Sequence, residues 1–188
     1  MSSVQLKTRM GFDQYLSWEE AQPSRHELID GNVFAMTGGS TAHGAVGLTL
    51  LALLRDHLKG SPCRVFWPDV KLRIGEESFY PDVKVSCAPG DLINAQYIER
   101  PVLIIEVLSP GTEDYDRGRK FDAYRQIVDL KEYLLVDPDL LTIELRRKIG
   151  PDQWQFFDLD QNARLDLQSV GFTCDAATLF ADLPPSKA

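Results

Sequence analysis

The pattern of apolar and polar positions along the chain predicts three helices. A short one is predicted over 12–20. A longer one is predicted over 42–59, where apolar side chains recur at helical spacing and where Gly60 and Pro62 end the pattern. The third is predicted over 113–128. The segments between these helices have a different period, which is typical of strands.

Strands are predicted wherever apolar and polar residues alternate. Residues 26–36 are predicted to form a hairpin, because Asp30-Gly31 favours a turn whose two central residues both have positive φ. Two alternating segments, 70–74 and 83–87, are predicted to form a second hairpin around a turn at 75–78.

The segment 102–108 is nearly all apolar, which is typical of a central strand buried on both faces. Later strands are predicted at 133–136, 141–147, 153–157 and 164–168. Strands and helices therefore mix along the chain, and we expect an α/β fold with a mixed central β-sheet flanked by helices.

Composition adds limits to this fold. The 188 residues suit one domain, since cores usually divide only above about 250 residues. We expect its core over about 10–145, with C-terminal β-hairpins over 141–170. The net charge of -8 argues against a strongly basic, non-specific nucleic-acid binder, which neutralises many phosphates with Lys and Arg. It leaves room for an enzyme with a local basic patch and a divalent cation.

The cysteines Cys63, Cys87 and Cys174 are odd in number and widely spaced, so they suggest neither a disulfide framework nor a zinc ribbon. We expect them to be reduced and mostly buried. The N-terminal residues contain no apolar signal core, and no stretch approaches the ~18 apolar residues of a membrane span. We therefore expect a cytoplasmic protein without a membrane partner.

Glu106 is the first candidate for chemistry, because it lies inside an otherwise apolar strand. An ionised carboxylate there is costly unless it is paired, hydrogen-bonded or bound to a metal. The alternative is a strand-end acid in an ordinary salt bridge or in water.

Lys120 is the second candidate. At ~100° per residue, it falls within the apolar arc of the predicted helix over 113–128, and so does Arg117. A lysine on an apolar face should seek a carboxylate or a phosphate. Glu106 precedes this helix and is the natural neighbour. The alternative is a lysine that extends to the rim of the core.

A second carboxylate comes from the Pro-Asp-Val-Lys segment that occurs twice, at 68–71 and at 81–84. Two carboxylates at adjacent strand ends make a hard oxygen site suited to Mg²⁺. Asp69 and Asp82 have the same local context, so the chemistry of the sequence does not choose between them.

Several motifs in this order resemble a known family. They are His26-Glu27-Leu28-Ile29-Asp30-Gly31, His43, Pro81-Asp82, Glu106-Val107-Leu108-Ser109-Pro110, Tyr115-Asp116-Arg117-Gly118-Arg119-Lys120, and Glu132-Tyr133 through Val136-Asp137-Pro138. Over about 10–145 the chain resembles the bacterial Uma family of restriction-endonuclease-like proteins, within the PD-(D/E)XK nuclease superfamily. The resemblance implies a restriction-endonuclease-like core.

It also implies an activity: metal-dependent hydrolysis of phosphodiester bonds in nucleic acid, with DNA the expected substrate. Asp82 would be the first acid and Glu106 the second, holding Mg²⁺ or Mn²⁺ with the Val107 carbonyl as a further ligand. The usual lysine position of the superfamily is occupied by Leu108, and Lys120 takes that place from the following helix. Lys84 is the spare basic residue. Many nucleases of this superfamily are dimers, so a homodimer is expected.

Two accessory residues have competing interpretations. Glu27 could reach the metal or a water, or it could be an ordinary hairpin acid. His43 begins the long helix, whose N-terminus suits a phosphate, although Ser40 or Thr41 could simply cap that helix.

Two other functions stay open. The chain could be a non-catalytic binding or regulatory protein that retains the fold. It could also self-associate through its late hairpins, which is compatible with either function.

Overall fold

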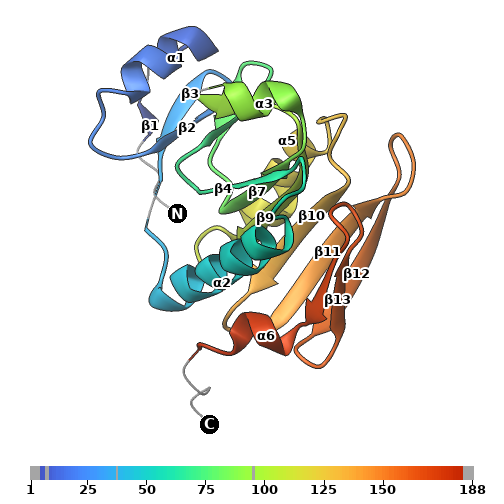
Figure 1. Ribbon diagram of the computed structural model, residues 1–188. Helices are drawn as coiled ribbons and strands as arrows, with labels where there is room; N and C mark the ends of the chain where they lie inside the picture. The colour runs from blue at the N-terminus through green and yellow to red at the C-terminus, as the bar shows by residue number, and fades with distance from the viewer. Residues whose placement is uncertain (1–4, 7–8, 37, 95, 184–188) are drawn as a thin grey trace.

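Two six-stranded sheets form the framework of the computed structural model, which describes residues 5–6, 9–36, 38–94 and 96–183 (Figure 1). The first sheet has the order β1 (Gln5–Leu6), β3 (Asn32–Ala35), β2 (His26–Ile29), β6 (Glu77–Phe79), β5 (Lys71–Ile74), β8 (Tyr97–Ile98). The second has the order β12 (Trp154–Asp160), β11 (Thr142–Lys148), β10 (Glu132–Asp137), β9 (Pro101–Val107), β7 (Val83–Ser86), β4 (Arg64–Phe66). The pair β13 (Arg164–Leu167) and β14 (Phe172–Asp175) stands apart.

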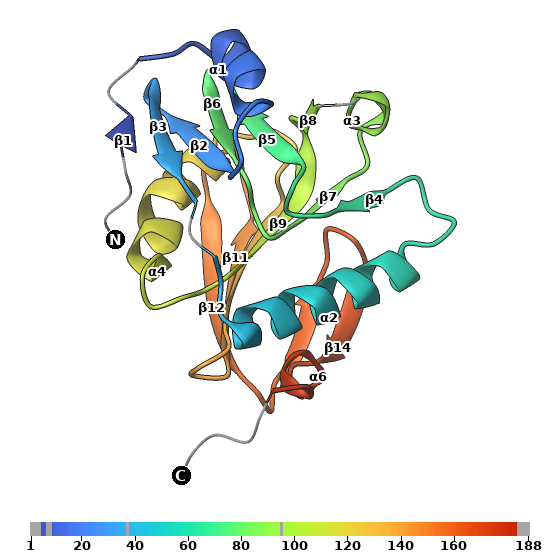
Figure 2. The same cartoon turned by 90° about the vertical axis from the view of Figure 1, so that its left-hand side faces the viewer.

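The helices lie around these sheets (Figure 2). They are α1 (Phe12–Glu19), α2 (Thr41–His57), α3 (Pro89–Ile93), α4 (Glu113–Tyr115), α5 (Phe121–Tyr124) and α6 (Ala177–Phe180), with one π-helical turn, η1 (Asp116–Lys120), between α4 and α5. None of the helices in the described part of the chain combines the length and apolar character needed to cross a membrane.

The second sheet has a different apolar layer on each face. On one face, Val83 and Ile105 belong to a core shared with α2, α6 and the β13–β14 pair. On the other face, Ile104 belongs to a core that contains Phe121 and Tyr124 of α5 and Leu72 and Phe79 of the first sheet. The second sheet is therefore the central layer of the molecule. It is mixed, because β9 runs parallel to β10 and antiparallel to β7. The predicted fold class is confirmed.

Several predicted elements are present with nearly the predicted bounds. The helices predicted over 12–20 and 42–59 are α1 and α2, and the strand predicted over 102–108 is β9. The first hairpin joins β2 to β3 through Asp30 (φ 50) and Gly31 (φ 77). These two positive φ angles are those that Asp-Gly favours, so the local sequence was sufficient to predict this hairpin.

The second predicted hairpin is wrong. β5 turns at residues 75–76 and pairs with β6, whereas residues 83–86 of the second segment form β7 in the other sheet, between β9 and β4. Alternation identifies a strand but not its partner. The chain crosses from one sheet to the other at 80–82, so Asp82 lies at that crossing.

The third predicted helix is shorter than 113–128 and is interrupted by η1. A π-helical turn is rare and often occurs at functional sites. This one places two buried charged residues, Asp116 and Lys120, in a single turn.

The expectation of three reduced, mostly buried cysteines is wrong for Cys63 and Cys87, which form a disulfide. All three cysteines are half-buried. The register of β4 and β7 explains the pair: Arg64 lies opposite Ser86, so the next residues outward, Cys63 and Cys87, also lie opposite each other. Their wide spacing in sequence conceals this contact.

We predict that replacing both Cys63 and Cys87 by Ser lowers the free energy of unfolding by about 3 kcal/mol, because the disulfide closes a loop of 24 residues in the unfolded chain. Urea denaturation under non-reducing conditions measures this. Cys174→Ser, at a half-buried position outside the disulfide, is the matched control and should lower stability by less than the double replacement. Three free thiols in the native wild type would contradict the prediction.

Candidate active site

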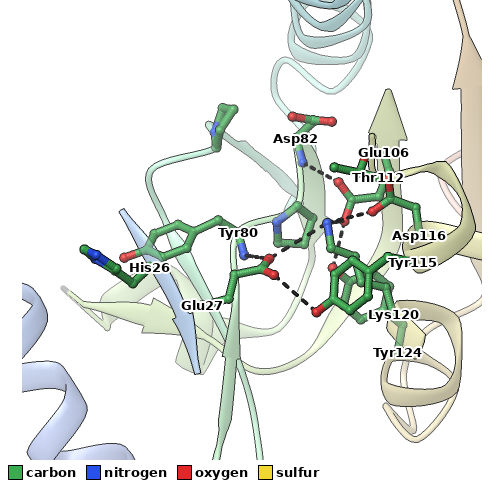
Figure 3. Close-up of polar contacts among 12 residues, drawn as sticks. His26, Glu27, Tyr80, Asp82, Glu106, Thr112, Tyr115, Asp116, Lys120 and Tyr124 are labelled. Atoms are coloured by element: carbon green, nitrogen blue, oxygen red, sulfur yellow. Dashed lines mark hydrogen bonds and ion pairs between the residues drawn. The ribbon is translucent and has the colours of Figure 1, made fainter. Parts of the chain in front are cut away.

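The register of β7 and β9 brings the two predicted acids together. Val83 pairs with Ile105 and Lys84 with Ile104, so the preceding residue, Asp82, lies beside Glu106. The backbone N–H of Asp82 donates to Glu106 Oε2 at 3.3 Å (Figure 3). Because side chains alternate along a strand, both acids point away from the α2 core.

Lys120 lies at the centre of a buried cluster of carboxylates (Figure 3). Its Nζ is 2.9 Å from Glu106 Oε1, 2.9 Å from Asp116 Oδ1 and 3.8 Å from Glu27 Oε1. All four side chains are less than a tenth exposed. Lys120 therefore points inward, as helical periodicity predicted, and it contacts more acids than the one expected.

Tyrosine hydroxyls complete the shell around these acids. Tyr124 OH donates to Glu106 Oε1 at 2.7 Å, and Tyr115 OH donates to Glu27 Oε2 at 3.3 Å. The backbone N–H of Tyr80 donates to Glu27 Oε1 at 3.2 Å. Glu27 is thus held from three sides, so it is part of the cluster and not an ordinary hairpin acid.

His43 approaches the same site from the first turn of α2. Ser40 caps this helix by accepting the His43 N–H at 3.1 Å, which is the capping alternative. The ring also has a partner: His43 Nε2 lies 3.1 Å from Asp82 Oδ2. The same oxygen accepts the Val107 N–H at 2.8 Å. Among the described residues, no hydrogen bond engages the other oxygen, Oδ1.

Burial and charge shift the pKa values of these groups in different directions. Burial raises the pKa of Glu106 to about 8, even though Lys120 opposes this shift. Burial alone would lower the pKa of Lys120, but the charges of Glu106, Glu27 and Asp116 raise it well above its ordinary value. Lys120 is therefore an ammonium at neutral pH.

Asp82 and His43 stabilise each other's charge. Burial works against the Asp82 carboxylate, but the hydrogen bond and charge of His43 lower the Asp82 pKa below its ordinary value. The hydrogen bond to Asp82 in turn raises the pKa of His43. Asp82 is therefore ionised, whereas burial makes ionisation of Glu106 costly.

The donor set of the site fits a hard divalent cation. The four acids Glu27, Asp82, Glu106 and Asp116 face three cations, which are Lys84, Lys120 and the protonated His43. In the described part of the chain, no three His, Cys, Asp or Glu side chains are arranged to ligate one ion. Such an ion would therefore need backbone carbonyl and water ligands as well, which suits Mg²⁺ because it usually takes one or two carboxylates and keeps several waters.

Three other candidates, Asp69, Arg117 and Lys84, do not contact the acids around Lys120. Asp69 is exposed and forms an ion pair with Arg25, so Asp82 is the acid that lies beside Glu106. Arg117 contacts Glu113 at 2.8 Å and Glu144 at 2.7 Å instead of the central acids. The ideal helical angle used to place Arg117 inward does not hold through the wider π-helical turn.

Lys84 is fully buried, but its partners are backbone carbonyls. Its Nζ donates to Pro81 O at 2.9 Å and lies 3.4 Å from Pro68 O. It thus joins the two Pro-Asp-Val-Lys segments and fixes the bend that precedes Asp82. Burial lowers the pKa of Lys84 to about 7.

Two residues of the site were missed from the sequence. Asp116 contacts Lys120, and Tyr124 contacts Glu106. One of them lies about a helical turn before Lys120 and the other about a helical turn after it. Their spacing of four residues on either side of Lys120 was the available signal. A stripe of acid, lysine and tyrosine on one helical face would have identified them.

Comparisons with known proteins show the family and the fold of the chain. The family model described as "Uma2: Putative restriction endonuclease" matches residues 12–177. Two proteins of Synechocystis are similar along most of their length. "Uncharacterized protein slr1290" is 38% identical over 173 residues, 91% of each chain. "Uncharacterized protein sll1609" is 34% identical over 158 residues, 81% of this chain and 89% of that one.

A solved structure has the same fold. It is described as a "putative nuclease belonging to DUF820" from Anabaena variabilis and superimposes with a TM-score of 0.75 at 18% sequence identity. The match covers 92% of this chain and 98% of that one. The sheets and helices thus define a protein of the restriction-endonuclease-like fold. Within that class, the chain belongs to the Uma2 family.

We predict that Lys120→Met destabilises the protein by about 3–5 kcal/mol, because it leaves the buried acids Glu106 and Asp116 without their cation. Adding Glu106→Gln should recover part of this loss, with a coupling energy above about 1 kcal/mol. Urea denaturation of the four proteins in this cycle measures the coupling. Lys131→Met, at an exposed position, is the matched control. If the two changes in unfolding free energy simply add, the predicted contact between Lys120 and Glu106 is contradicted.

A second prediction concerns pH. The pKa of Lys84 is about 7 in the folded chain and about 10.5 when unfolded, so the unfolded chain binds more protons between these values. Stability owed to this residue should therefore rise with pH, by about 1.4 kcal/mol per pH unit from about pH 7 to 10. The difference in unfolding free energy between wild type and Lys84→Met should follow this slope. A difference that is flat with pH would show that Lys84 stays charged.

Proposed function

We propose that this protein is a metal-dependent nuclease that hydrolyses phosphodiester bonds in nucleic acid. The observation that carries the proposal is the buried contact of Lys120 with Glu106, next to Asp82 at the crossing between the two sheets. Membership in a family described as restriction endonucleases supports it. The charge balance supports it too, since the excess of carboxylates suits a divalent cation.

Asp82, Glu106 and the Val107 carbonyl would hold Mg²⁺ or Mn²⁺. When bound, the ion would lower the pKa of a coordinated water and offset negative charge on the phosphate. Asp82 is suited to this role because His43 and the Val107 N–H fix one of its oxygens and leave Oδ1 free of hydrogen bonds from the described residues.

Lys120 would orient the attacking water and offset charge on the transition state. Its raised pKa supports a permanent cation and argues against the alternative role of a base that deprotonates the water. Tyr124 would hold Glu106 in position, since its hydroxyl shares Oε1 with Lys120.

The repeated Pro-Asp-Val-Lys segment provides a matched test. We expect Asp82→Asn to lower metal-dependent cleavage by about 100-fold or more, whereas Asp69→Asn should retain it, because only Asp82 lies beside Glu106. Nicking of supercoiled, linear and single-stranded DNA with Mg²⁺, Mn²⁺ or EDTA measures this. Thermal melting of both variants confirms folding. Equal cleavage by the two variants would contradict the assignment of Asp82.

A non-catalytic binding or regulatory role is the second candidate. One observation favours it: both oxygens of Glu106 already have partners, namely Lys120, Tyr124 and the Asp82 N–H. The cluster could therefore be a structural ion pair. Calorimetric titration with Mn²⁺ separates the two functions, since the nuclease requires binding that Asp82→Asn loses and Asp69→Asn keeps. Self-association through the late hairpins stays a prediction in either case.

A further inference from the structure

A cavity opens beside Lys120, between the β2–β3 hairpin and the segment that leads into α4. It has a volume of about 490 Å³, and its walls include Glu27, Ile29, Phe34, Met36, Tyr115 and Lys120. Figure 2 shows α4 beside β3. Small-molecule sites commonly enclose about 300–1000 Å³ and combine apolar walls with a few polar groups. The cavity has this composition, and it shares Glu27 and Lys120 with the proposed catalytic cluster.

Two aromatic side chains face this cavity from opposite elements. Phe34 is half-buried on β3, where it lies opposite Glu27. Tyr115 is half-buried at the end of α4, and its hydroxyl is held by Glu27 at 3.3 Å. Lys120 Nζ lies 5.6 Å from the centre of the Tyr115 ring, whereas the described residues place no other ring or cation against the ring of Phe34. Aromatic rings of this kind are the platforms on which unpaired bases stack.

Charge beside the site gives an independent reason to favour base contacts over phosphate contacts. Arg117 is engaged by Glu113 and Glu144, and Arg119 is engaged by Glu77 and Asp30. Duplex binding depends mainly on Lys and Arg that neutralise phosphates on both strands. The arginines nearest Lys120 are already paired with acids, and the net charge is -8. We therefore expect the base to contribute much of the affinity at this site.

We infer that the Lys120 cavity holds one unstacked nucleobase, so that the substrate is a single strand, or a duplex with an unpaired nucleotide next to the bond that is cut. This inference rests on the proposed function. The phosphate attached to that nucleotide would lie at Lys120, and its base would stack in the cavity on Phe34.

Equilibrium binding tests the inference without requiring cleavage. The protein carries Asp82→Asn, and the probes are fluorescein-labelled oligonucleotides read by anisotropy at fixed salt. They are a single strand, its duplex, the same duplex with one bulged nucleotide, and that bulged duplex with the bulged nucleotide abasic. The single strand and the bulged duplex should bind more tightly than the duplex. The abasic probe should lose affinity by about 5- to 150-fold relative to the bulged probe, the range for loss of one base–aromatic stack.

Phe34 provides the matched variants. Phe34→Leu keeps an apolar side chain without a ring and should lose the same factor on the bulged probe but little on the abasic probe. Phe34→Tyr keeps the ring and should retain binding. Phe156→Leu removes an exposed ring on β12 and is the control, which should bind as the Asp82→Asn parent does.

The outcomes are distinct. Equal affinity for bulged and abasic probes, or an equal effect of Phe34→Leu and Phe156→Leu, overturns the base cavity even if wild type cleaves DNA. Base-dependent binding by a chain whose wild type cleaves none of the probes with Mg²⁺ or Mn²⁺ supports the cavity and overturns the proposed hydrolysis.

Discussion

The structure depends on how one buried ammonium group is shared among several buried acids. Glu106 and Asp116 are almost inaccessible to water, and each lies 2.9 Å from Lys120 Nζ. A buried carboxylate without a partner is far less stable than one exposed to water, so the position of Lys120 constrains every element that supplies an acid. Three parts of the chain meet there: the β2–β3 hairpin through Glu27, β9 through Glu106, and η1 through Asp116.

This constraint also accounts for the irregular helix. A regular α-helix over 113–128 would carry Arg117 inward together with Lys120. The π-helical turn at 116–120 instead leaves Arg117 with Glu113 and Glu144 while Lys120 remains inside. A rare π-helical turn thus occurs where Lys120 is held in the position that the proposed hydrolysis requires. The aromatic shell of Tyr124 and Tyr115 then fixes the acids around the ammonium group.

Much of this could be predicted from the sequence, for identifiable reasons. Helical periodicity predicted that Lys120 points inward. Glu106 was identified because it is an acid within the apolar strand β9. The choice between Asp69 and Asp82 could not be made locally, because it depends on which strand pairs with β9. The same limit produced the wrong hairpin for the segment 83–87 and hid the contact of Cys63 with Cys87. Pairing between strands distant in sequence is a tertiary property, which alternation does not encode.

The opposed faces of β7 and β9 have a further consequence. Val83 and Ile105 lie in the α2 core, whereas Asp82 and Glu106 lie on the opposite side of the same two strands. A shift of β7 by one residue would bury Asp82 against α2 and bring Val83 into the acid cluster. The register of β7 therefore determines both the packing of the core and the position of Asp82 in the site. A substitution in β7 alters one position, whereas a single-residue insertion or deletion would disrupt the core and the site together, so relatives with this fold should vary in length only outside β7.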